Sequence, residues 1–467
     1  MATDLGSPSP RRIPAREEHR RCLRLEAWAI ICREKVLSQV CSDMIRAKPE
    51  GAPLSWRRGS GLRNRFSRLT GIVIRKLMKD SFRVPQSWAL SVFEAAQMEN
   101  PERVAFFLPS LAGGGAQRVA VNLANGFAAR GYQVDLVLAQ AKGPFLSHVS
   151  EDVRVVDLTS SRVLYSTRGL FRYLRSNRPS AIISSMTHAN LFAALLTTVG
   201  IRDTKCILVE HSHVSPSIPP QTGLRERIVL LLARFLYPLA DRIVAVSEGA
   251  SKDLAAFLGK PSTSVTWIYN PIFDASLGED AGTPIPHGWL EREAAPVILN
   301  VGRLEEIKDH PTLLHAFAKI RARREARLVI LGDGERRSEL QALSEELGVT
   351  DDVLLPGFVT DPYAWMRECA VFVLSSRSES FGNVLVEAMA CGASVVSTDC
   401  PSGPAEILGN GKWGRLVPVG DADAMAEAIE DAIEAGAPPE GSLDRARDFG
   451  VDTAVDAYIE LIGSPNS

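Results

Sequence analysis

Short apolar runs alternate with segments of helical periodicity along most of the chain, beginning at Arg103. Each run is too short for a helix and is rich in β-branched or aromatic residues, as is typical of a buried strand. Because such strands alternate with amphipathic helices, the pattern predicts a parallel sheet covered by helices on both faces. The runs expected in this first sheet are Val104 to Leu108, Val134 to Leu138, Ala181 to Ile183, Cys206 to Val209, Ile243 to Val246 and Val265 to Ile268.

The alternation stops at a Gly-, Pro- and Asp-rich stretch from Asp274 to Pro286, which is typical of a linker, and then restarts. The second set of runs is Val297 to Val301, Leu328 to Leu331, Val353 to Leu355, Val371 to Leu374, Ser394 to Ser397 and Leu416 to Val417. The pattern predicts an α/β protein with two facing, doubly wound Rossmann-like domains around a central cleft. Their expected limits are residues 101–275 and 290–450, followed by a final helix within 451–467.

Residues 1–100 do not follow this pattern, and they carry 19 Lys and Arg against 10 Asp and Glu, whereas the remainder carries 34 against 45. We expect a basic extension that is disordered at its start. Between Trp56 and Lys79, Leu62, Phe66, Leu69, Val73 and Leu77 form an apolar stripe among basic residues. A helix lying on an anionic membrane surface is one interpretation. A helix packed on the main body and an unstructured extension are the alternatives, whereas no motif indicates nucleic-acid binding.

The composition is that of a globular protein, with 45% hydrophobic and 23% charged residues. The seven cysteines are scattered without a metal-binding spacing, which favours a reducing cytoplasm. No run is long and apolar enough to predict a transmembrane helix. The closest run, Ile228 to Ala240, contains Arg234 and Pro238, and we expect a core helix there.

The stretch after the run Val371 to Leu374 contains two carboxylates, Glu379 in a polar loop and Glu387 inside a helix expected over Asn383 to Ala390. Side chains on a helix tilt toward its N-terminus, so Glu387 can lean back toward the loop that carries Glu379. The unpaired amides at the start of this helix attract anions, and they belong to Gly382, Asn383 and Val384. The alternative is that Glu379 caps the helix and that Glu387 is a solvated surface residue.

This segment, E-S-F-G-N-V-L-V-E-A-M-A-C-G, resembles the E-x7-E segment of glycosyltransferase family 4, within the retaining GT-B transferases. The resemblance implies that Glu379 lies near the donor sugar and that Glu387 holds the ribose of the nucleotide. It also implies donor contacts from the residues between them, namely Phe381, Gly382, Asn383 and Val384.

A glycine loop follows the first strand, in L-P-S-L-A-G-G-G-A-Q-R-V from 108 to 119. Glycines let the backbone approach a phosphate, and the helix that follows supplies amides, although a simple tight turn is the alternative. The loop resembles the N-terminal glycine loop of the family, which implies that Gly114 and Gly115 contact the donor diphosphate or the acceptor.

The second domain begins with N-V-G-R-L-E-E-I-K-D-H, from 300 to 310, directly after a predicted strand. A leaving nucleoside diphosphate gains negative charge, which Arg303 and Lys308 are spaced to stabilise. The pair resembles the diphosphate clamp of the family, and the alternative is that Arg303 pairs with Glu305 or Glu306. We expect no metal, because the only D-x-D, Asp421 to Asp423, is better explained as a helix N-cap.

The first domain contributes V-E-H-S-H, from 209 to 213, after another predicted strand. By resemblance His211 reaches toward the donor sugar from the acceptor side, while His213 and His188 are weaker candidates. In L-L-P-G-F-V, the backbone near Phe358 would meet the nucleotide base. The resemblance thus implies catalytic roles for His211, Glu379, Arg303 and Lys308.

These observations, taken with the resemblance, predict a glycosyltransferase of the hexosyltransferase class that uses a nucleotide-sugar, most simply a UDP-sugar, without a cofactor or metal. Retention of configuration is what the resemblance implies. The expected acceptor is a glycan or a lipid-linked molecule in cell-surface polysaccharide, lipopolysaccharide or glycolipid synthesis. We expect a cytoplasmic protein with peripheral contact at the cytoplasmic face of the membrane and no nucleic-acid partner. The alternatives are a sugar-nucleotide epimerase or hydrolase on the same scaffold, and a non-catalytic protein that binds sugar nucleotides.

Overall fold

The computed structural model describes residues 102–160, 163–201, 203–214, 224–279, 287–290 and 295–463, which belong to one compact unit, Val92–Ser467. The basic extension expected over 1–100, with its stripe between Trp56 and Lys79, lies outside the described residues. The end of the expected linker, residues 280–286, lies outside them as well. Every cysteine that the structure describes is free.

The first sheet has seven parallel strands in the order β3-β2-β1-β4-β5-β6-β7. Its strands are β1 (Arg103–Leu108), β2 (Gln133–Leu138), β3 (Val153–Asp157), β4 (Ala181–Ser185), β5 (Lys205–Glu210), β6 (Arg242–Ala245) and β7 (Thr266–Trp267). Six of them match the predicted runs to within a few residues. Strand β3 was not predicted, because it is an edge strand whose side chains are mostly exposed and its sequence, VRVVD, lacks an apolar run.

The second sheet has six parallel strands in the order β10-β9-β8-β11-β12-β13. They are β8 (Val297–Val301), β9 (Arg327–Leu331), β10 (Val353–Gly357), β11 (Val371–Leu374), β12 (Val395–Thr398) and β13 (Arg415–Val417). Two parallel-sheet, Rossmann-like domains are therefore confirmed.

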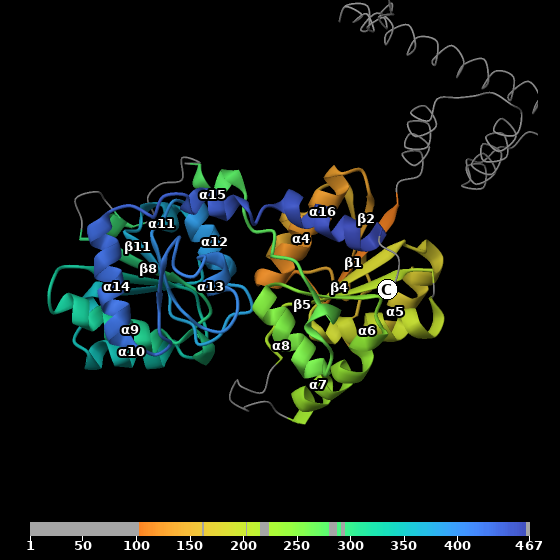
Figure 1. Ribbon diagram of the computed structural model, residues 1–467, viewed down its shortest axis with the longest axis horizontal. Helices are drawn as coiled ribbons and strands as arrows, with labels where there is room; N and C mark the ends of the chain where they lie inside the picture. Colours follow the sequence, from red (N-terminus) through yellow and green to blue (C-terminus); the bar gives the residue numbers. More distant parts are fainter. Residues whose placement is uncertain are drawn as a thin grey trace, which may run out of the picture. The chain divides into compact units, whose positions relative to one another are not determined.

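Helices cover both faces of the first sheet, as Figure 1 shows. One face is covered by α4 (Gly115–Ala129) and by the last helix of the chain, α16 (Val451–Gly463). The other face is covered by α5 (Val163–Asn177), α6 (Thr187–Gly200), α7 (Leu224–Leu236) and α8 (Glu248–Leu258). This division follows from right-handed crossovers, because β1 to β2 runs in one direction across the sheet and β3 to β7 runs in the other.

The prediction of a core helix over Ile228 to Ala240 is correct for the helix itself but wrong in its end and in its complete burial. Helix α7 ends at Leu236, and the 3₁₀ turn η2 (Tyr237–Leu239), which contains Pro238, follows it. One side of α7 packs into the domain core, but its other side is exposed. Among the helices described, none has both the length and the apolar character needed to cross a bilayer.

The second sheet is also covered on both faces. Helices α9 (His310–Arg321), α10 (Arg337–Glu346) and α14 (Ala422–Ala435) share one core. Helices α11 (Tyr363–Glu368), α12 (Asn383–Ala390), α13 (Pro404–Ile407) and α15 (Ser442–Arg447) contribute to the other. The remaining short 3₁₀ turns are η1 (Pro144–His148), η3 (Ser262–Ser264), η4 (Ala275–Gly278), η5 (Gly288–Leu290), η6 (Glu306–Lys308) and η7 (Thr350–Asp352).

The D-x-D segment begins α14, as predicted from its capping pattern. The Asp421 carboxylate accepts hydrogen bonds from the amides of Asp423 and Ala424, which confirms the N-cap. Asp423 pairs with Lys319 of α9. Both carboxylates therefore have a structural explanation.

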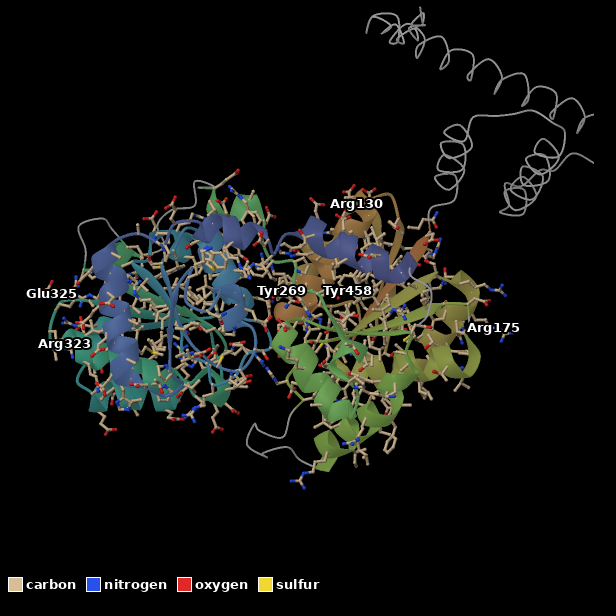
Figure 2. The ribbon with its side chains drawn as sticks, in the orientation of Figure 1. Arg130, Arg175, Tyr269, Arg323, Glu325 and Tyr458 are labelled. Carbon is tan, nitrogen blue, oxygen red and sulfur yellow. The ribbon has the colours of Figure 1, made fainter. Side chains whose placement is uncertain are left out.

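The chain joins its two domains through shared backbone and aromatic contacts. The amides of Ile272 and Phe273 both donate to the carbonyl of Phe449, immediately before α16. Tyr269, labelled in Figure 2, packs against the rings of Phe449 and Phe381. Helix α16 then lies against α4. The final helix thus returns to the first domain after the second domain is complete.

The core beneath α4 generates a stability prediction. Phe127 is fully buried and makes edge contacts with the rings of Phe106 and Tyr132. Phe127→Ala should lower the free energy of unfolding by about 3–5 kcal/mol, since it removes buried area and leaves a cavity. Leu443→Ala, at an exposed position in α15, should change it by less than about 0.5 kcal/mol. Equal effects of the two variants in urea unfolding would contradict this description of the core.

Candidate active site

The loop between β11 and α12 holds Glu379 beside a lysine. Glu379 Oε1 accepts hydrogen bonds from Lys308 Nζ at 2.5 Å and from Ser376 Oγ at 2.7 Å. The side chains of Lys308 and Glu379 are only 20% and 13% exposed, so their charges compensate each other in a largely covered setting. The alternative in which Glu379 caps α12 is wrong, because the N-cap is Gly382 and no side chain caps this helix.

The loop after β8 presents the two predicted cations differently. The carbonyl of Lys308 accepts a hydrogen bond from Ser375 Oγ, so the lysine is tied to the β11 loop through its backbone as well. Arg303 is 76% exposed, and its Nη1 lies 2.5 Å from Glu305 Oε1. The structure therefore brings Lys308, but not Arg303, to Glu379, and Arg303 makes the pairing that the solvated alternative anticipated.

The glycine loop of the first domain meets the beginning of α12. Gly115 lies so close to Asn383 that a Cβ atom at 115 would be 2.6 Å from Asn383 Nδ2. Asn383 Oδ1 also accepts a hydrogen bond from Asn270 Nδ2 at 2.8 Å. Gly114, the N-cap residue of α4, precedes this contact directly. Three predicted donor-binding positions, Gly114, Gly115 and Asn383, are thus neighbours at the junction of the two domains.

Glu387 is buried rather than solvated, since it is 6% exposed. Its Oε1 lies 2.9 Å from Nη1 of Arg118, a residue of α4, and Arg118 also contacts the Tyr363 hydroxyl. Burial raises the pKa of Glu387, and the positive charge of Arg118 opposes that rise. Sequence reasoning missed Arg118, although it belongs to the glycine-loop segment, because its partner lies 269 residues away.

The two histidines after β5 occupy different environments. His211 is half-buried as a residue, but its Nε2 atom is covered and has no hydrogen-bond partner in the described structure. Burial lowers the pKa of His211 to about 4, so its imidazole is neutral at pH 7. His213, the weaker candidate, has its Nε2 3.2 Å from the carbonyl of Glu379 and its Nδ1 3.3 Å from Asp253. Burial lowers the pKa of His213, but the hydrogen bond and charge of Asp253, together with the carbonyls of Glu379 and Pro401, outweigh burial, and the net shift is upward.

A buried carboxylate orients the segment that carries these histidines. Glu210 is 1% exposed, and its Oε1 accepts hydrogen bonds from the amides of His211 and Ser212, both at 3.1 Å. Its Oε2 accepts from the Tyr237 hydroxyl at 2.6 Å, and Thr187 donates to both oxygens. Glu210 therefore positions the backbone of His211 from within the domain core. The sequence did not indicate this role, because it showed only that Glu210 lies at the end of a predicted strand.

The remaining predicted donor-binding residues differ in exposure. Phe381 is 2% exposed and packs on Tyr269 and Phe449, so its side chain serves the domain junction. Phe358, directly after β10, is 74% exposed. Gly382 has φ of 101°, a conformation that favours glycine, and it starts α12 ahead of Val384, which is half-buried.

A second set of contacts holds the Glu379 loop against the first domain. Ser247 Oγ, at the N-cap of α8, donates to the carbonyl of Ser380 at 2.7 Å. The amides of Glu248 and Gly249 donate to the Glu406 carboxylate of α13 at 2.9 and 2.8 Å. A helix N-terminus is a favourable place for a carboxylate. The first bond holds the loop one residue after Glu379, and the other two hold α13 against the beginning of α8.

Comparison with known proteins adds to this geometry. The family described as Glycosyltransferase Family 4 matches residues 113–275, and the family described as Glycosyl transferases group 1 matches residues 285–448. N-acetylgalactosamine-N,N'-diacetylbacillosaminyl-diphospho-undecaprenol 4-alpha-N-acetylgalactosaminyltransferase of Campylobacter jejuni is 30% identical over 344 residues, 71% of this chain and 90% of that protein. The lipopolysaccharide core biosynthesis glycosyltransferase LpsE of Rhizobium meliloti is 35% identical over 175 residues, 36% of this chain and 50% of that protein.

Solved structures share the arrangement of the two sheets. HepE of Anabaena, in complex with UDP and glucose, superposes with a TM-score of 0.66 at 22% identity and covers 78% of this chain and 100% of that one. The lipopolysaccharide outer core galactosyltransferase WaaB, in its apo form, gives a TM-score of 0.57 at 20% identity over 77% of this chain and 99% of that one. At sequence identities of 22% and 20%, these comparisons show that the fold is shared.

The pair Arg118 and Glu387 generates a pH-dependent prediction. Arg118→Ala should lower the free energy of unfolding by about 2 kcal/mol at pH 7, less than for a fully buried pair because Arg118 is partly exposed. Without its cation, folded Glu387 favours the protonated form more strongly, whereas in the unfolded chain its pKa is about 4.3. Since the folded state then binds more protons, stability should fall as pH rises above about 4.3 and recover below it.

Urea unfolding between pH 4 and pH 8 measures this difference. The decrease with pH should be steeper for Arg118→Ala than for the wild type. The double variant Arg118→Ala, Glu387→Gln lacks the titrating group and should lose the added slope. Parallel pH profiles for all three proteins would show that Arg118 does not compensate the charge of Glu387.

Proposed function

Because the chain belongs to glycosyltransferase family 4, we propose that it transfers a sugar from a UDP-sugar to a lipid-linked glycan, with retention of anomeric configuration and without a divalent ion. The observation that carries the proposal is the contact of Lys308 with Glu379 at the beginning of α12. That contact adjoins groups from the other domain, since His213 meets the carbonyl of Glu379 and Gly115 meets Asn383.

The charges suit a reaction that releases a nucleoside diphosphate. As the bond to the sugar breaks, negative charge grows on the diphosphate, and a cation in a largely covered site stabilises it. Lys308 has three N–H donors and uses one on Glu379, so others remain for phosphate oxygens. The unpaired amides at the start of α12 add to this stabilisation. Arg303, at the beginning of the loop that carries Lys308, is the second cation that we assign to the clamp.

A uridine nucleotide is supported by the HepE structures, which contain UDP or UDP-glucose. We assign Glu387 to the ribose hydroxyls and the backbone around Phe358, an exposed residue, to the base. Since Arg118 already binds Glu387, donor binding has to share or displace that contact. Arg118 is therefore a positioning residue for the donor site in this proposal.

The acceptor assignment is supported by the relative from Campylobacter jejuni, whose name includes a diphospho-undecaprenol acceptor, and by LpsE of lipopolysaccharide core synthesis. The neutral imidazole of His211 can donate to or accept from a sugar hydroxyl, and its Nε2 has no hydrogen-bond partner among the described residues. Glu379 approaches from the opposite domain and can align the reacting sugar.

Product analysis tests the proposal. Purified protein is incubated with each UDP-sugar alone, and then with the UDP-sugar and a polyprenyl-diphosphate-linked glycan, in buffer with and without EDTA. Transfer only in the presence of acceptor, an α-linked product by proton NMR and undiminished rates in EDTA are expected. Rapid hydrolysis or epimerisation of the donor alone would support a different enzyme, and rescue by Mg²⁺ after EDTA would contradict the metal-independent mechanism.

The clamp generates a prediction for its cations. Lys308→Ala or Arg303→Ala should each lower kcat/KM about ten- to a hundredfold, the effect of losing roughly 1.5–3 kcal/mol of charge-assisted bonding to diphosphate. Lys319→Ala is the matched control, because Lys319 pairs with Asp423 on the opposite face of the second domain. Normal turnover by both clamp variants would show that the diphosphate binds elsewhere.

Substitutions of the two glutamates should change different kinetic parameters. Glu387→Gln should mainly raise the donor KM, because ribose contacts are the same in the ground state and the transition state. Glu379→Ala and His211→Ala should mainly lower kcat, by about an order of magnitude or more, because they align the reacting sugar. Calorimetric titration with UDP, beside steady-state rates, separates these effects. Loss of UDP affinity in Glu379→Ala but not in Glu387→Gln would reverse the two roles.

A further inference from the structure

Helix α7 exposes an apolar stripe on the side that faces away from the first sheet. Ile228, Leu231, Leu232 and Phe235 are 48%, 56%, 44% and 67% exposed, at a spacing that places them on one helical face. The opposite face of α7 packs into the domain core through Ala233 and its neighbours. An exposed apolar stripe on a helix is typical of a binding surface, so the outer face of α7 calls for a covering partner.

The stripe continues across the two adjacent helices. Helices α5, α6 and α7 lie side by side on the same face of the first sheet (Figure 1). Leu164 and Tyr165 of α5 are 61% and 63% exposed, and Leu195 and Val199 of α6 are 39% and 76% exposed. We call these eight side chains the α5–α7 face. With Leu239 just after α7, they make up nine of the fourteen large apolar side chains that are exposed in the described residues, so the exposure is concentrated here.

The charges on these helices are almost all positive. Helix α5 carries Arg168, Arg172 and Arg175, α6 carries no Lys, Arg, Asp or Glu, and α7 carries three arginines against one glutamate. Arg227 and Arg234 are exposed and flank the stripe of α7 on one side. Arg175, labelled in Figure 2, is exposed at the end of α5. An apolar stripe with arginines beside it matches the surface of a lipid bilayer, which is apolar in its interior and carries anionic phosphates at its headgroups.

We propose that the α5–α7 face docks on an anionic lipid bilayer, with its apolar side chains in the interface and its arginines at the phosphate headgroups. A second copy of the chain fits less well, because two such faces would bring arginines against arginines. The proposal rests on the proposed function in one respect, since a lipid-linked acceptor is held at a bilayer. It places the membrane contact in the folded first domain rather than in the basic stripe between Trp56 and Lys79.

The location of the face suits this role. Helix α7 follows β5, the strand that ends at Glu210 next to His211. The sheet face opposite α5–α7 is covered by α4 and α16, and α4 supplies Gly115 and Arg118 to the domain junction. Docking through α5–α7 therefore leaves the groups of the candidate active site in contact with the second domain.

Vesicle co-sedimentation of the full chain tests the proposal without measuring sugar transfer. Vesicles of phosphatidylcholine with phosphatidylglycerol are compared with pure phosphatidylcholine. Leu231→Gln, Phe235→Gln should lower partition onto the anionic vesicles roughly tenfold or more, because two apolar side chains leave the interface. Arg227→Gln, Arg234→Gln should lower it roughly fivefold per arginine in low salt, with little effect on neutral vesicles.

The matched control is Val419→Gln, Leu443→Gln, which changes two exposed apolar positions in the second domain and should leave partition unchanged. Thermal unfolding and UDP titration should be the same for all variants, which separates loss of docking from loss of folding or of donor binding. If the wild-type protein binds anionic vesicles but transfers no sugar, the proposed function is refuted while the docking proposal stands.

Two results would overturn the docking proposal. Wild-type partition by the Leu231→Gln, Phe235→Gln variant would assign any membrane binding to another part of the chain, such as residues 1–100. A wild-type oligomer in sedimentation velocity that dissociates in the same variant, together with no binding to anionic vesicles, would make the α5–α7 face an interface between copies.

Discussion

A buried carboxylate that requires a cation ties the two domains together. Glu387 of α12 is almost fully covered, and Arg118 of α4 supplies the positive charge from the other domain. A buried charge without a partner is costly, so this pair constrains how α4 and α12 approach each other. Because α4 begins at the glycine loop and α12 begins next to Glu379, the same constraint brings these two chemical segments together. The close approach of Gly115 to Asn383 follows from this constraint.

The candidate site divides its charges between the domains. The second domain provides a compensated ion pair, Lys308 with Glu379, and the amides that begin α12. The first domain provides imidazoles, of which His211 is held neutral by burial and is positioned through the Glu210 carboxylate. In the proposed mechanism, this arrangement stabilises developing charge on one side of the transferred sugar and aligns an uncharged hydroxyl on the other. Neither domain has the complete set.

The first sheet uses its two helical layers for different purposes. A parallel sheet has to be covered on both faces, so both layers follow from the fold. The layer of α4 and α16 carries the junction with the second domain, together with the beginning of α8 from the other layer. The layer of α5, α6 and α7 has no such task in the described structure, yet its outer surface holds most of the exposed apolar side chains. Docking on a lipid surface gives this second layer a function that agrees with a lipid-linked acceptor.

The sequence alone determined the elements, because strand and helix patterns are local: β8, β11 and α12 have the predicted limits, and Asp421 is the predicted cap. It missed β3, since an exposed edge strand has no apolar run, and it assigned α7 wholly to the core, since periodicity does not say which apolar face is covered. The choice of partners was decided only by tertiary structure. Lys308 rather than Arg303 meets Glu379, and Arg118 meets Glu387, across separations of 71 and 269 residues. Such contacts depend on how packed layers bring distant segments together, which no local pattern encodes.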